Sequence, residues 1–75
     1  MNAIEAVKHI ASESGLSWRK ISSELGHAPT YLASTFRKSS DMGASNVAKL
    51  ANLLGWKLIL KKGTEEIEIS PRSTD

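Results

Sequence analysis

One stretch of the chain spaces small and polar residues as a single helix face would. The residues at i, i+3, i+4 and i+7 are Thr30, Ala33, Ser34 and Arg37, and Pro29 precedes them. Such a face offers two hydroxyls and a guanidinium, which bind through hydrogen bonds and charge. Its small residues lie near the N-terminal end, so this helix could enter the major groove of DNA, which is about 12 Å wide.

Residues for other kinds of chemistry are missing. The chain has no cysteine, which removes disulfides, thiolate metal sites and cysteine nucleophiles. It has no glycine-rich phosphate loop, and His9 and His27 fall on different expected elements without paired carboxylates. No serine has a base at a recognisable spacing. We therefore expect no enzyme, no metal site and no cofactor.

The net charge of +2 is distributed unevenly along the chain. Residues 17–62 hold eight lysines and arginines against two acids, a net charge of +6. Residues 1–16 have a net charge of −1, and residues 63–75 a net charge of −3. A basic middle suits a polyanion such as DNA, whose phosphates attract lysine and arginine. An ordinary solvated surface is the alternative interpretation.

Capping residues and glycines divide the first 55 residues into four short helices. Asn2 and Ser17 suit helix starts, and Gly26 suits a helix end. The expected helices cover residues 3–14, 18–25, 29–38 and 44–54. The inward pairs of the second and third helices are Ile21 with Leu25 and Leu32 with Phe36. Because these two helices are joined by so tight a turn, they must cross at a large angle, and small Ser22 permits their close contact.

The apolar spacing changes to period two after Gly55, which predicts a β-hairpin over residues 56–70. A two-residue turn at Gly63-Thr64 suits the type II′ form, with glycine first. The expected cross-strand pairs are Leu60 with Ile67, Leu58 with Ile69 and Lys61 with Glu66, which match apolar with apolar and opposite charges.

This arrangement resembles the Cro/C1-type (phage λ repressor-like, XRE-type) helix-turn-helix family over roughly residues 3–56. The resemblance is carried by Gly15-Leu16-Ser17, Ile21…Leu25-Gly26, Leu32…Phe36 and Leu50-Ala51…Leu54-Gly55. It implies a helical bundle that binds palindromic DNA as a dimer, with residues 17–38 as the helix-turn-helix. There are two departures. Trp18 replaces the usual polar residue at the start of the second helix, and the hairpin replaces a fifth helix, as in the Cro branch.

The resemblance also implies which residues contact DNA. Base contacts would come from Ala28 to Ser34, including hydrogen bonds from Thr30 and Ser34 and thymine-methyl packing by Pro29 or Ala33. Arg37 would contact a guanine or a phosphate. The expected phosphate contacts are Ser17, Trp18, Arg19 and Lys38. Some residues have a second interpretation: Trp18 could cap the core, Tyr31 could pack at the helix edge rather than touch DNA, and His27 could be a solvated turn residue.

A C-terminal strand can build the dimer in the Cro branch. The expected dimerisation residues are Trp56, Leu58, Leu60, Ile67 and Ile69. The neighbouring Lys57, Lys61 and Lys62 would either protect the strand edge or clamp phosphate.

We therefore expect one mainly α domain over residues 1–70, a four-helix λ repressor-like DNA-binding domain with a C-terminal β-hairpin, and a flexible tail at 71–75. Met1 to Glu5 do not have the layout of a secretory signal, no apolar run would span a membrane, and the absence of cysteine suits the cytoplasm. The expected function is a dimeric, sequence-specific transcriptional repressor. The alternative is an antitoxin or other protein-interaction module whose hairpin binds a partner.

Overall fold

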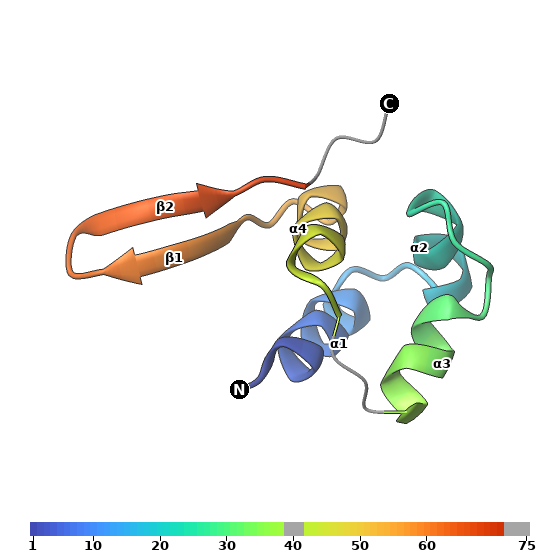
Figure 1. Cartoon of the computed structure of the whole chain (residues 1–75). Coiled ribbons are helices and arrows are strands. Elements are labelled where there is room, and N and C mark those ends of the chain that lie inside the picture. The colour runs from blue at the N-terminus through green and yellow to red at the C-terminus, as the bar shows by residue number, and fades with distance from the viewer. Residues whose placement is uncertain (39–41, 72–75) are drawn as a thin grey trace.

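The computed structural model describes residues 1–38 and 42–71 (Figure 1). The sequence predicts a loop at 39–43 and a tail at 71–75, of which residues 39–41 and 72–75 lie outside the described residues. Within the described ranges the elements are α1 Ala3–Glu13, α2 Trp18–Glu24, α3 Tyr31–Lys38, α4 Ala44–Leu53, β1 Leu58–Lys62 and β2 Glu65–Ile69. The prediction of a mainly α fold with a C-terminal hairpin is confirmed.

Local capping bonds account for the starts of α1 and α2. Asn2 Oδ1 accepts a hydrogen bond from the Glu5 N–H at 2.8 Å, and Ser17 Oγ accepts one from the Lys20 N–H at 3.1 Å. Each bond satisfies an amide that the helix itself leaves without an acceptor. The Asn2 and Glu5 side chains are also hydrogen-bonded to each other, with Asn2 Nδ2 donating to Glu5 Oε1 at 3.2 Å.

The prediction that the third helix begins at Pro29 is wrong by two residues. Pro29 lies instead in a turn that the Tyr31 N–H closes by donating to the Ala28 carbonyl at 2.9 Å. The fixed φ of proline suits the second position of such a turn as well as it suits a helix start. The first helical bond of α3 then runs from the Ser34 N–H to the Thr30 carbonyl, also at 2.9 Å.

One apolar core joins all four helices. Its buried members are Val7, Ala11, Ile21, Leu25, Leu32 and Leu50, and half-buried Trp18, Tyr31, Phe36 and Val47 pack against it. The predicted inward pairs therefore face the core. Figure 1 shows α2 and α3 on one side of the α1 and α4 pair and the hairpin on the other.

The hairpin has the predicted register. Leu58 pairs with Ile69, Leu60 with Ile67 and Lys61 with Glu66. Gly63 has φ +59°, which glycine adopts without strain and which a two-residue hairpin turn requires. The two strands extend away from α4 rather than lying across the helices (Figure 1).

Candidate nucleic-acid interface

A buried serine holds α2 and α3 together. Ser22 Oγ donates to the Trp18 carbonyl at 2.7 Å within α2 and accepts from the Leu32 N–H at 3.1 Å in α3. The Ser22 side chain is fully buried, and its backbone carbonyl accepts from the His27 N–H at 3.0 Å. One residue of α2 therefore satisfies an N-terminal amide of α3 and anchors the turn between the helices.

Replacing Ser22 by alanine is expected to lower the free energy of unfolding by about 1–3 kcal/mol, because the buried Leu32 N–H loses its acceptor. Urea denaturation followed by circular dichroism measures the change. Exposed Ser23 provides a matched control, and Ser23→Ala is expected to change the free energy by less than about 0.5 kcal/mol. Equal stability of the two variants would contradict the role assigned to Ser22.

The inner side of α3 is fixed by packing. Leu32 is completely buried, and the Phe36 ring meets the edge of the Trp18 indole with centroids 4.9 Å apart and planes at 79°. Aromatic pairs favour this edge-to-face geometry. Trp18 is half-buried and packs on the core, so its ring lies on the anchoring side of α3. Of the two interpretations of Trp18, the contacts favour the core.

The outer side of α3 carries the face of small and polar residues that the sequence predicts. Thr30, Ala33 and Arg37 are exposed, and Ser34 is half-buried. Ala28 and Pro29 in the preceding turn are exposed as well, and Lys38 follows Arg37 in the last turn. The helix has eight residues, which at 1.5 Å per residue makes it about 12 Å long. This face is thus short, with small side chains along most of its length and cations at its C-terminal end.

Two aromatic rings stack across the turn before α3. The His27 imidazole and the Tyr31 phenol lie face to face, with centroids 3.9 Å apart and planes at 10°. Tyr31 is half-buried and packs on the core, whereas His27 is exposed. Tyr31 is therefore positioned as the helix-edge interpretation expects. The partner of His27 was not predicted, because a four-residue spacing across the turn at Pro29-Thr30 indicates no contact.

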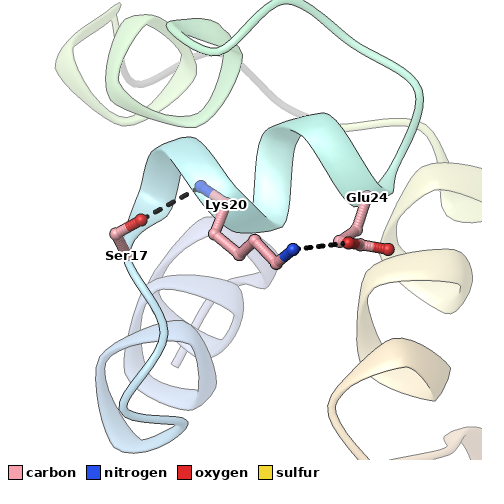
Figure 2. Close-up of polar contacts among 3 residues, drawn as sticks. All are labelled: Ser17, Lys20 and Glu24. Carbon is pink, nitrogen blue, oxygen red and sulfur yellow. Dashed lines mark hydrogen bonds and ion pairs between the residues drawn. The ribbon is translucent and has the colours of Figure 1, made fainter.

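The start of α2 contributes a second set of polar groups. Ser17 Oγ accepts a hydrogen bond from the Lys20 N–H, and the Lys20 Nζ lies 3.0 Å from Glu24 Oε1; Figure 2 shows both contacts. Because Glu24 partly neutralises the Lys20 ammonium, Lys20 would attract a phosphate less strongly than an unpaired lysine would. Arg19 is exposed and forms no ion pair with any described residue, and the same holds for Arg37 and Lys38. These three are the cations that the α2–α3 unit offers to an anionic partner.

A lysine from α4 supports the far end of α2. Lys49 Nζ donates to the Leu25 carbonyl at 3.0 Å, at the C-terminus of α2, where the helix dipole favours a cation. The contact fixes α2 to α4 and uses the charge of Lys49 inside the fold. Sequence reasoning missed it, because nothing in the spacing of residues 24 apart indicates that they meet.

The hairpin lysines are mostly paired. Lys57 Nζ lies 3.6 Å from Glu68 Oε1, and Lys61 Nζ lies 3.8 Å from Glu66 Oε2. Lys62 stands opposite Glu65 in the register. This pairing favours a role in the strands over a phosphate clamp. The expected dimerisation residues divide into exposed Trp56, Leu60 and Ile67, and half-buried Leu58 and Ile69.

Comparison of the chain with protein-family models, with curated proteins and with solved structures finds no match in any of the three. No cluster of three or more histidines, cysteines or carboxylates among the described residues has the geometry to hold a metal ion. In the described ranges, no helix is both long and apolar enough to cross a bilayer. The α2–α3 unit and the hairpin are therefore the features of this molecule that indicate a function.

Proposed function

We propose that this protein is a sequence-specific DNA-binding regulator of transcription. The observation that carries the proposal is the two-sided construction of α3. Leu32, Phe36 and the Ser22 hydrogen bond hold one side, while Thr30, Ala33 and Arg37 project from the other. A short helix held in this way, with small residues at its N-terminal end, could enter a major groove, which admits an α-helix.

The proposed contacts fall into two groups. Thr30 and Ser34 hydroxyls reach base edges, and Ala33 or Pro29 packs on a thymine methyl. Arg37 binds a guanine or a phosphate, while Ser17, Arg19 and Lys38 bind phosphates and so set the orientation of the protein on the duplex. Trp18 is half-buried and packs on the core, so only part of its side chain could contact a phosphate. The resemblance to the Cro/C1-type family supports the same assignment and adds that the regulator is a repressor, and the absence of cysteine suits a protein of the cytoplasm.

Two copies of the chain would read a palindrome. A twofold dimer places its two α3 helices in successive major grooves, about 34 Å apart. Because the hairpin lies on the opposite side of the helical bundle from α3, a dimer formed by hairpins leaves both binding helices exposed (Figure 1). We assign the dimer contact to the apolar face of the hairpin, defined as Trp56, Leu58, Leu60, Ile67 and Ile69.

Selection of bound duplexes from a random pool tests the proposal directly. We expect enrichment of an inverted repeat, which would demonstrate base reading and twofold symmetry together. Binding to the selected duplex should fall steeply with salt, because bound lysines and arginines displace counterions from phosphates. A pool that shows no enrichment, with binding that salt does not weaken, would contradict the proposal.

A protein-interaction module, such as an antitoxin, is the second candidate. It is favoured by one observation, the exposed apolar side chains on the hairpin: Leu60 is 59% exposed, and Trp56 and Ile67 are each 54% exposed. Exposed apolar patches mark contact surfaces. Retention on heparin with a steep salt dependence supports the DNA-binding function, whereas salt-insensitive binding to a protein supports this one. The two functions are compatible in one chain.

Neighbouring residues on opposite faces of β1 test the dimer contact. Leu60→Lys is expected to shift the chain from dimer to monomer in sedimentation experiments, because it places a charge in the apolar face. Ile59→Lys is the matched control, since Ile59 lies on the other face opposite Glu68 and is itself 39% exposed. The assignment of the dimer contact to this face would be contradicted if the Leu60→Lys protein stays dimeric or the Ile59→Lys protein becomes monomeric.

A further inference from the structure

An apolar groove lies where the hairpin leaves the helices. Its volume is about 240 Å³, and it is lined by Ala6 and Ile10 of α1, Val47 of α4, and Trp56 and Leu58 at the start of the hairpin. The titratable side chains in its lining are His9 and Lys57, so no carboxylate is present there. A groove with this lining takes an apolar occupant.

The groove is continuous with the apolar face of the hairpin. Leu58 belongs to both, and the next pair outward on the same face is Leu60 with Ile67, the most exposed pair of that face. The surface therefore carries a hollow at one end and a projecting pair of aliphatic side chains at the other. A surface that contains both a hollow and a matching projection can pair with a rotated copy of itself, which is what a twofold interface requires.

Charge on the strands argues against the obvious alternative, in which hairpin edges pair into a longer sheet. Lys57, Lys61 and Lys62 lie on or beside β1, whereas all three glutamates of the hairpin lie on β2. Symmetric pairing of β1 with β1 would bring six lysines into two adjacent strands, and pairing of β2 with β2 would do the same with six glutamates. Like charges on neighbouring strands destabilise a sheet, so the twofold contact is left to the apolar face.

We propose that the groove is the receptor for a second copy of this chain, and that the Leu60 and Ile67 pair of each hairpin seats in the groove of its partner. Lys62 and Glu65 lie on the same face as this pair, at the tip of the hairpin. Docking brings Glu65 toward His9 and Lys57, the two basic groups of the partner's groove. The arrangement deepens the proposed dimer, but it does not depend on whether that dimer binds DNA.

Docking of each hairpin on its partner would also stabilise the hairpin. Two strands with both edges open are marginally stable alone, and this hairpin extends from the bundle with most of its side chains exposed. Seating in a partner's groove covers its apolar face. Because the chain is only 75 residues long, the added burial also enlarges a small core.

Engineered cysteines test the arrangement cleanly, because the natural chain has none. Chains with Ala6→Cys are mixed with longer, tagged chains carrying Leu60→Cys and are oxidised mildly without DNA. We expect a mixed disulfide dimer of intermediate mass. It should form about a thousandfold faster than with Ser12→Cys, since docked thiols meet at an effective concentration near millimolar rather than the micromolar concentration of the protein. Ser12 is exposed on α1 and does not line the groove.

Val47→Cys provides a second groove position on another helix, and circular dichroism checks that each variant is folded. Equal rates for the groove and Ser12 positions would overturn the proposal, as would a purely monomeric chain in sedimentation. A dominant disulfide between two Leu60→Cys chains would also overturn it, because it would place residue 60 at the twofold axis. The duplex selection is scored separately, so failure of this arrangement and failure of DNA binding are distinguishable.

Discussion

Leu32→Ala is expected to lower the free energy of unfolding by about 2–5 kcal/mol, the usual cost of truncating a buried leucine. Leu32 is completely buried in the core cluster, and its own N–H is the group that Ser22 accepts from. The change leaves a cavity directly behind the proposed binding surface. For a small domain whose total stability is on the order of 5–15 kcal/mol, this loss is a large fraction of the total stability.

Urea and thermal denaturation followed by circular dichroism measure this effect, and operator binding at the same temperature should fall with the folded fraction. Leu53→Ala is the matched control, because Leu53 is 40% exposed and lies at the end of α4. We expect it to cost less than about 1 kcal/mol, since little apolar area is lost. A Leu32→Ala protein as stable as the Leu53→Ala protein would show that α3 is not anchored as described.

Arg37→Ala is expected to have the largest effect on DNA binding without unfolding the protein. Loss of a base-reading arginine costs about 1–3 kcal/mol. A dimer on a palindrome presents Arg37 twice, so the operator affinity would fall by about 2–6 kcal/mol if the two half-sites contribute independently. Because Arg37 is exposed and pairs with no described acid, its removal leaves no buried group unsatisfied.

Fluorescence anisotropy with the selected duplex at a fixed salt concentration gives the affinities. Lys8→Ala is the control, because it removes one positive charge from the exposed side of α1 and from no proposed contact. If Arg37 reads a base, Arg37→Ala also relaxes selection at one operator position. If it binds phosphate, the loss is uniform across sequences and the salt dependence weakens by about one unit of slope per protomer. Unchanged affinity would remove Arg37 from the interface.

Much of the fold could be predicted, because local rules agree along the chain. Asn2 and Ser17 cap the helices they were expected to cap, and the inward pair of Ile21 with Leu25 is buried. The hairpin register followed from matching apolar residues and opposite charges across Gly63-Thr64. A shift of one residue would have turned Leu58 and Leu60 to the face with the charges, so the alternation leaves little choice.

The contacts that hold the candidate site were harder to predict. Small size explains why Ser22 fits between α2 and α3, but its hydrogen bond to Leu32 depends on how the two helices cross. The same applies to Lys49 and the Leu25 carbonyl, which meet only after α4 has packed on α2. Trp18 was ambiguous because its ring suits both a core and a surface, and only the position of Phe36 resolves which one it contacts.

The Ser22 bridge has a consequence for how the molecule meets a duplex. Since a side chain of α2 accepts a hydrogen bond from the first turn of α3, reorienting either helix alone would break that buried bond. The conformational entropy of α2 and α3 is thus lost when the chain folds, so little more would be lost when the protein binds a duplex. In the proposed complex, a poorly matched operator would have to bend or twist to fit the protein, so discrimination would extend to base pairs that the protein never touches.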